Sequence, residues 1–272
     1  MAALYPAATG IYTYTSPGVV VDYSNAKEGY IGVLYSKNKE KNCKVMVKKD
    51  GGGSMNFDVT YGKQVFLPLS LGAGAYTVQV FEQVEGTKYK QILLCGFDAK
   101  IEDPQRPYLY PNTYCDYNGD SECVRFLDDI CGGMATQVEK LAVWYAWVVD
   151  NIHYDYDLAA TVTADSPWWL PDPDAVLRER KSICFGFASL FAALRSQGIP
   201  VRIEVGRVGY MDVKHAYNAV WLDDGGHITE HVDVLPKTWF RLDPTFDATG
   251  ASDKEIAALT ADDLNYKFEY RG

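Results

Sequence analysis

One stretch of the chain is so apolar that it has to lie inside a protein core. Residues 184–197 place four bulky apolar side chains at helical spacing, and small residues fill most of the other positions. A helix that is apolar nearly all round is stable only when other elements cover it. Ser182 is a candidate N-cap before this stretch, and Gly198 marks its end. The sequence therefore predicts a buried helix around which its domain packs.

Cys184 stands in the first turn of this predicted helix. The free N–H groups and the positive end of the helix dipole favour a thiolate at that position. A cysteine nucleophile would be placed there. Most free cysteines, however, are small apolar residues of a core. The position alone leaves both interpretations open.

Length and composition limit the kinds of protein that this chain can be. Its 272 residues suffice for one large domain or two ordinary ones, and 47% of them are hydrophobic. A net charge of -10 argues against nucleic acid as the main partner, because phosphate binding needs a basic surface. No apolar run approaches the roughly 20 residues of a membrane helix. Residues 1–6 lack the features of a signal peptide, which predicts a cytoplasmic protein or a mature chain without its leader.

The six cysteines are too few for a disulfide scaffold at this length, and none form a C-x-x-C pair. Metal and thioredoxin-type sites thus lose their best sequence support. Cys115, Cys123 and Cys131 lie close together in the chain, so a bridge among them remains open.

Residues 1–103 are predicted to form a β-sandwich. Short β-rich runs recur at a spacing typical of that fold, at 19–23, 30–35, 43–48, 57–61, 65–69, 76–81 and 89–94. No set of residues there suits catalysis, so we expect an accessory domain. A Pro-containing segment, 103–107, follows as the linker.

Residues 104–272 are predicted to be helical first and then an antiparallel meander, which makes the whole chain α+β. Apolar residues mark one face of a helix over 138–152, and Pro173 begins a short second helix. After the cysteine helix, four strands are predicted, at 201–205, 215–221, 228–234 and 238–243.

Two of these strands carry groups that could activate a cysteine. A cysteine nucleophile needs a base and a third group that orients the base. His215 opens one predicted strand, and Asp243 closes another. Because neighbouring antiparallel strands can bring these ends together, Asp243 could accept a hydrogen bond from the imidazole.

The order of these groups resembles the transglutaminase-like core, a family of papain-like cysteine enzymes, over roughly residues 124–250. Four ordered blocks carry the resemblance: 181–188, 194–202, 215–218 and 242–245. It implies a catalytic triad of Cys184, His215 and Asp243. It also implies a cysteine helix packed on an antiparallel sheet, within a catalytic domain over 104–272.

The chain departs from the family pattern at three positions. Ser182 stands where a glycine is usual, and Tyr217 and Phe246 stand where tryptophan is common. The two aromatic replacements keep their ring character. None of the three changes removes a chemical group, so the triad is retained.

Other residues have weaker claims to a site. His227 and His231 could suggest a metal, but on a strand they would lie about 13 Å apart, too far for one ion. Tyr154 could stabilise an oxyanion or pack under the cysteine helix. Trp168 and Trp169 could line a substrate groove or fold inward.

An acidic cluster comprises Asp155, Asp157, Asp165, Asp172 and Asp174. It could attract a cation or a lysine-bearing substrate, and the simpler interpretation is a solvated loop.

The resemblance implies attack on an amide carbonyl of a protein or peptide through a thioester, with no cofactor required. Bacterial members are often peptidase-like, which favours water as the acceptor over an amine. The alternative is a non-catalytic module that binds peptide or glycan. The N-terminal half is similar to β-rich domains of bacterial surface proteins, which implies an extracellular or cell-surface location and association with the surface or with peptidoglycan.

Overall fold

A computed structural model describes residues 3–162, 169–208, 214–229, 232–250 and 266–272. The chain forms two compact units, residues 6–107 and residues 1–5 with 108–272. The sequence had placed the domain boundary after residue 103. The two units are described separately below.

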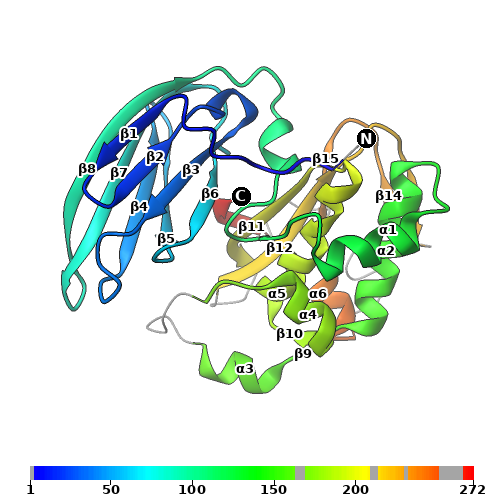
Figure 1. Ribbon diagram of the computed structural model, residues 1–272. Helices are drawn as coiled ribbons and strands as arrows, with labels where there is room; N and C mark the ends of the chain where they lie inside the picture. The colour runs from blue at the N-terminus through cyan, green and yellow to red at the C-terminus, as the bar shows by residue number, and fades with distance from the viewer. Residues whose placement is uncertain (1–2, 163–168, 209–213, 230–231, 251–265) are drawn as a thin grey trace. The chain divides into compact units, whose positions relative to one another are not determined.

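The first unit is a β-sandwich of two four-stranded antiparallel sheets, which confirms the predicted fold (Figure 1). One sheet has the order β1 (Thr13–Ser16), β2 (Val19–Asp22), β3 (Tyr30–Tyr35) and β6 (Gln64–Pro68). The other has the order β5 (Ser54–Val59), β4 (Cys43–Lys49), β7 (Gly74–Glu85) and β8 (Lys88–Ala99). A 3-10 turn covers Ala26–Glu28.

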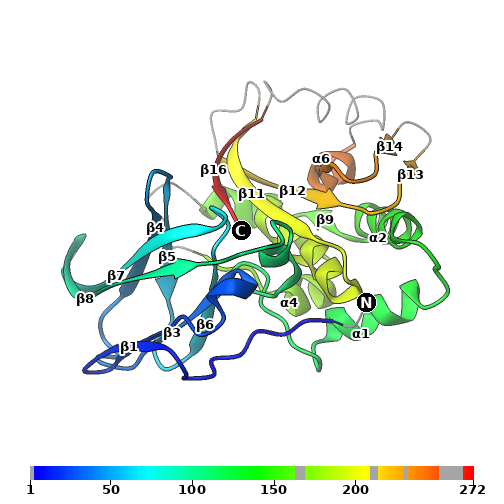
Figure 2. The ribbon, with the colours of Figure 1, turned by 90° about the horizontal axis from the view of Figure 1, so that it is seen from above.

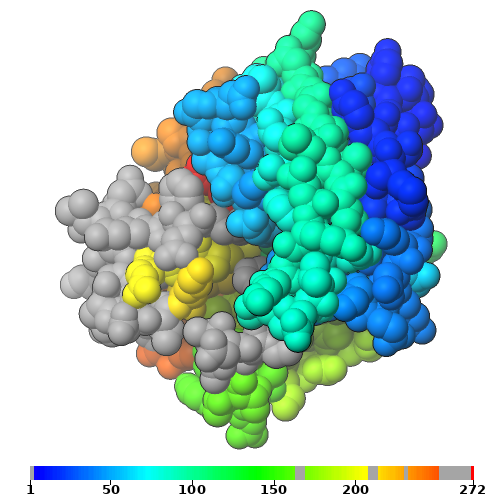
Figure 3. Space-filling view, turned by 90° about the vertical axis from the view of Figure 1, so that its left-hand side faces the viewer, coloured from blue at the N-terminus to red at the C-terminus, as the bar shows by residue number. Residues whose placement is uncertain are grey.

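Alternating side chains explain why these segments form a sandwich. Val45 and Val47 of β4 are fully buried and lie opposite Val80 and Val78 of β7. The residues between them point to the other face, as the period of two requires. Half of the β8 residues are exposed, and the strand runs as a stripe along the surface of this unit (Figure 3).

Seven of the eight strands in this unit were predicted from the sequence. The exception is β1, whose residues Thr13–Ser16 are half-buried or exposed and show no apolar alternation. This strand forms at the edge of its sheet because its backbone pairs with β2, and that pairing leaves no mark in the sequence.

The second unit is built on a four-stranded antiparallel sheet with the order β15 (Trp239–Leu242), β12 (Lys214–Trp221), β11 (Val201–Val208) and β16 (Tyr266–Arg271). Figures 1 and 2 show how the helices gather beside this sheet. The helices are α1 (Glu122–Cys131), α2 (Gln137–Asn151), α3 (Tyr156–Thr161), α4 (Pro173–Glu179), α5 (Cys184–Phe191) and α6 (Pro244–Ala248), with 3-10 segments at Arg106–Leu109 and Ala192–Gln197. Short strand pairs are β9 (His153–Tyr154) with β10 (Lys181–Ser182), and β13 (Gly226–Thr229) with β14 (Val232–Val234).

Most predicted elements of this unit are confirmed. Helix α2 begins with a capping box made by Thr136 and Glu139, and α4 begins at Pro173, as predicted. The prediction of one strand over 228–234 was wrong, because β13 and β14 pair with each other as separate short strands. Helix α1 and strand β16 were not predicted.

The cysteine helix forms the core of this unit, as its composition predicts. Phe187, Leu190 and Phe191 are fully buried, and the 3-10 turn after α5 ends at Gly198, whose φ of 73° suits glycine. The predicted N-cap was wrong. Ile183 occupies that position without a side-chain cap, because Ser182 pairs with Tyr154 in the short β9–β10 ladder.

A buried arginine joins three distant parts of this unit. The Arg195 side chain is 1% exposed and donates hydrogen bonds to the backbone oxygens of Val201, Tyr110 and Gly272 at 2.6–2.9 Å. Carbonyl oxygens thus satisfy a guanidinium that would be costly to bury alone. This explains why an arginine stands in the otherwise apolar end of the cysteine helix.

All six cysteines are free thiols, so the bridge that remained open among Cys115, Cys123 and Cys131 does not form. None of the helices in the described ranges is both long and apolar enough to cross a membrane.

Candidate active site

Two neighbouring strands bring His215 and Asp243 together, as their predicted positions required. Strand β12 pairs with β15 so that Asn218 lies opposite Leu242. His215 Nε2 lies 2.7 Å from Asp243 Oδ2, and both side chains are buried. Because a carboxylate only accepts, Nε2 donates to it, and Nδ1 is left for another partner.

Cys184 supplies that partner from the start of α5. It is the first residue of the helix, it is partly exposed, and it lies close enough to His215 to contribute to the raised pKa of the imidazole. The structure thus brings together the three residues of the predicted triad.

A buried asparagine fixes the cysteine helix to the strand that carries His215. Asn218 Nδ2 donates to Ala188 O of α5 at 3.0 Å and to Arg202 O of β11 at 3.2 Å. Sequence reasoning missed this role. An amide in the middle of an apolar strand was the available signal, since a buried amide needs partners.

The environment of His215 favours its protonated form. Burial lowers its pKa, but the Asp243 carboxylate and the hydrogen bonds with Asp243 and Cys184 outweigh this effect and raise the pKa from 6.5 to about 10. The imidazole can therefore hold a proton at neutral pH next to the cysteine sulfur.

Cys184 differs from the other cysteines in its exposure. The other five thiols are buried, and burial raises the pKa of each, to about 12 for Cys43 and Cys115. A buried neutral thiol is a poor nucleophile. Only Cys184 combines solvent access with a histidine partner.

Phe246 covers the imidazole. Its ring, on α6, stacks on His215 with centroids 4.8 Å apart and an interplanar angle of 11°. The sequence identified Phe246 only as a replacement for tryptophan. Its position shows that the aromatic ring shields the His215–Asp243 pair.

Residues 124–244 match the family model of the transglutaminase-like superfamily. This part of the chain is a transglutaminase-like domain. The match covers the cysteine helix, His215 and Asp243, and it confirms the family resemblance of the sequence. A search of curated proteins found no match.

Three solved structures resemble the chain at low scores. A candidate cysteine protease from Cytophaga hutchinsonii has a TM-score of 0.45 and 12% identity, over 90% of this chain and 78% of that one. A TGase has a TM-score of 0.35 and 20% identity, over 54% of this chain and 35% of that one. A candidate protease from Parabacteroides distasonis has a TM-score of 0.28 and 9% identity, over 75% and 61%. The family assignment rests on the sequence match.

Tyr154 lies close to Cys184 in the transglutaminase-like domain. Burial and the neighbouring Cys184 raise the pKa of Tyr154 above its ordinary value. Its ring also packs edge-on against Tyr156, with centroids 5.0 Å apart. Tyr156 belongs to α3 and not to the cysteine helix, so the oxyanion role and the packing role of Tyr154 both stay predictions.

The remaining candidates of the domain lie apart from the triad or outside the described residues. His227 pairs with Asp233 between β13 and β14, where both of these side chains are exposed. His231, Trp168 and Asp165 lie outside the described residues. Across the ranges that the structure describes, no cluster of three His, Cys, Asp or Glu side chains could hold a metal.

The acidic cluster is split by the fold. Asp174 accepts from the backbone N–H of Cys123 at 2.9 Å, and Asp157 is exposed on α3. Asp155 and Asp172 line a pocket beside α5, together with Trp169.

Ser182 and Gly186 fit together at the start of the cysteine helix. A Cβ at Gly186 would overlap the Ser182 hydroxyl and lie 2.6 Å from the Ser182 Cβ and 3.1 Å from Val176 Cγ2. The Ser182 Cβ cannot move without its backbone. The family's usual glycine at position 182 would relieve this overlap.

We expect Gly186→Ala to lower the free energy of unfolding by about 1–3 kcal/mol, the usual cost of overpacking, despite the gain of about 1 kcal/mol in helix propensity. In a Ser182→Gly background, the same substitution should be neutral or stabilising. Urea unfolding of the four proteins measures this coupling. An equal cost in both backgrounds would contradict the packing argument.

Proposed function

We propose that the chain is a cysteine-dependent enzyme that attacks amide bonds of a protein or peptide. The observation that carries this proposal is the hydrogen bond of 2.7 Å between His215 and Asp243. Cys184, at the start of α5, lies close enough to the imidazole to raise its pKa. A thiol at a helix start, a base beside it and a buried carboxylate behind the base are the parts that nucleophilic catalysis needs.

In the proposed mechanism, the Cys184 proton moves to His215 Nδ1, and the sulfur attacks the amide carbonyl. The resulting oxyanion is held by backbone N–H groups at the start of α5, which have no intrahelical acceptor. His215 then gives the proton to the leaving nitrogen, and a thioester remains on Cys184.

Asp243 keeps the imidazole in position during these steps. Because Nε2 donates to Asp243, the ring presents Nδ1 to the sulfur in every protonation state. Phe246 lies flat on the ring and keeps water from the buried ion pair. Asp243 thus supports the base without taking the proton itself.

The thioester is resolved by water, which we propose as the usual acceptor, with His215 removing a proton from it. A primary amine in place of water would give a cross-linked product. The predicted cell-surface location and the association of the sandwich with the surface or with peptidoglycan stay predictions.

One experiment separates these reactions. The chain is incubated with a glutamine-rich protein and a fluorescent primary amine, and peptide cleavage, ammonia release and amine incorporation are read in the same tube. We expect hydrolysis products to form in larger amount than the product with incorporated amine. Treatment of the protein with iodoacetamide should prevent the formation of both. If none of the three products forms, the result would support the alternative of a non-catalytic binding module. The three residues of the site would then be present without catalysing a reaction.

A further inference from the structure

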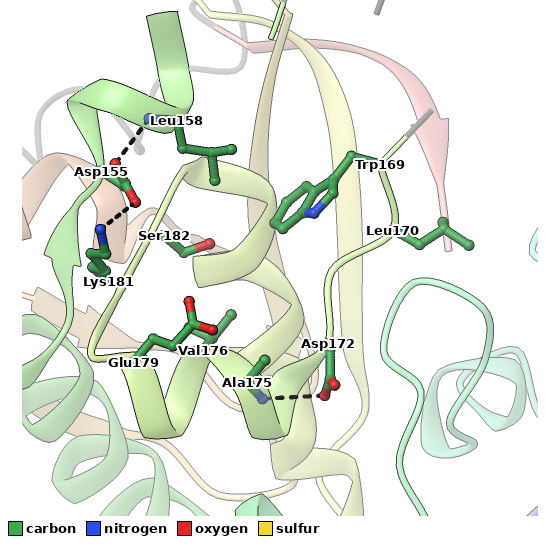
Figure 4. A pocket seen from close by; sticks show the side chains of 10 residues that line it. All are labelled: Asp155, Leu158, Trp169, Leu170, Asp172, Ala175, Val176, Glu179, Lys181 and Ser182. Carbon is green, nitrogen blue, oxygen red and sulfur yellow. Dashed lines mark hydrogen bonds and ion pairs between the residues drawn. The ribbon is translucent and has the colours of Figure 1, made fainter. Parts of the chain in front are cut away.

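A pocket of about 330 Å³ lies beside the start of the cysteine helix (Figure 4). Its walls come from α3, α4, β10 and residues 169–170. The volume is in the range of pockets that hold small ligands or single side chains. The proposed triad does not use this pocket, since none of its residues line it.

The pocket has an apolar wall that suits an aliphatic stem. Trp169, Leu158 and Val176 line it from three different segments. In Figure 4 the Trp169 ring faces the open centre of the pocket. Such a surface contacts the methylene groups of a long side chain while its polar end stays free.

The polar part of the lining is mainly acidic. Three carboxylates, of Asp155, Asp172 and Glu179, stand against one ammonium group, of Lys181. The Lys181 ammonium group forms an ion pair with Asp155 at 3.2 Å. It therefore does not neutralise the negative charges of Asp172 and Glu179. Asp172 uses Oδ1 to cap α4, whereas the exposed Glu179 carboxylate points toward the pocket (Figure 4). The net charge of this lining selects a cation.

A buried hydroxyl adds a second, independent polar group. Ser182 is 2% exposed as a residue, and it lines the pocket. Figure 4 shows its oxygen turned toward the centre. A hydroxyl that lines a pocket can accept a hydrogen bond from a donor group of a ligand.

The pocket is close to the proposed nucleophile. Ser182 precedes Cys184 by two residues, a separation of roughly 7 Å at most along the backbone. On the other side, Trp169 packs edge-on against Phe185, the residue after Cys184, with centroids 6.4 Å apart. A side chain near the attacked amide can therefore reach the pocket.

We propose that this pocket receives a lysine or arginine side chain of the peptide that Cys184 attacks, an inference that rests on the proposed function. The stem lies along Trp169, and the cationic end meets Glu179 and Asp172. The Ser182 hydroxyl accepts a further hydrogen bond from the ammonium or guanidinium group.

A peptide set tests this proposal on the full chain. Hexapeptide amides carry lysine, norleucine or glutamate at one position at a time, so that lysine and norleucine differ only in the cationic end. At the peptide position whose side chain enters the pocket, we expect kcat/KM to be about tenfold higher for the lysine peptide than for the norleucine peptide. The glutamate peptide should have the lowest kcat/KM. Glu179→Gln should lower kcat/KM for the lysine peptide about threefold to fivefold and leave the norleucine peptide unchanged.

Asp157→Asn is the matched control, because it removes a carboxylate from exposed α3 outside the pocket lining and should change neither peptide. Calorimetry measures the affinity of the same peptides for Cys184→Ala, with and without Glu179→Gln. This measurement does not depend on catalysis. A missing preference for lysine, or an equal loss for both peptides in Glu179→Gln, overturns the subsite. Lysine-selective binding without any turnover keeps the pocket assignment and refutes the proposed function.

Discussion

Replacing Cys184 with alanine is expected to lower amide turnover by about 10³-fold or more, because the substitution removes the proposed nucleophile, the one cysteine of the six that is not buried. Release of ammonia or of a cleaved peptide measures the loss. The helix should stay intact, because alanine has a higher helix propensity than cysteine. The variant should therefore unfold at the same urea concentration as the wild type.

Cys131→Ala is the matched control, since Cys131 is buried at the end of α1 and should leave turnover unchanged. Intact-mass analysis after iodoacetamide should show one added group on the native wild type and none on Cys184→Ala, because the other five thiols are buried. Full activity of Cys184→Ala would falsify the assignment of the nucleophile.

The rate of alkylation as a function of pH separates an enzyme from a binding module. A sulfur activated by a protonated histidine reacts quickly well below pH ~8.5, where ordinary free thiols react slowly. A rate that rises only around that pH would support the non-catalytic alternative.

The second large effect is expected for Asp243→Asn, which keeps the size of the buried side chain and removes its charge. Asp243 is a main cause of the raised pKa of His215. Without the carboxylate, burial should pull that pKa back toward or below 6.5. We expect kcat/KM to fall by about 10²-fold or more, because the imidazole would hold its proton poorly and could take the wrong orientation.

The pH profile of kcat/KM provides the specific signature. In the wild type, the basic limb should lie near the folded pKa of His215, about 10, and in Asp243→Asn it should move several units toward acid. A substitution that merely loosened the fold would lower activity without moving this limb.

The same pair makes stability depend on pH. The pKa of His215 is higher in the folded chain, about 10, than its ordinary value of 6.5. The stabilisation is therefore fully present below pH 6.5 and is lost as the pH rises toward 10. The melting temperature of the wild type should exceed that of Asp243→Asn at pH 6, and the gap should close toward pH 10. If the difference in melting temperature between the wild type and Asp243→Asn grew with rising pH, the result would contradict the assignment of this ion pair.

The sequence alone determined the elements and the chemical groups of this protein. Alternating valines predicted the sandwich strands, and the apolar stretch 184–197 predicted a core helix with Cys184 in its first turn. Both patterns are local, so they can be recognised without knowledge of the fold. The positions of His215 and Asp243 at strand ends likewise allowed their contact to be predicted.

Tertiary structure decided what depends on residues far apart in the chain. Helix α5 begins at Cys184 because Ser182, the predicted N-cap, pairs with Tyr154 instead, and Ser182 also lines the pocket. The stacking of Phe246 on His215 and the joining of α5 to β12 by Asn218 also arise from contacts between separate elements. No spacing rule encodes these contacts, because they depend on how helices and sheet pack in three dimensions. The sequence thus supplied the reactive groups, and packing set their surroundings.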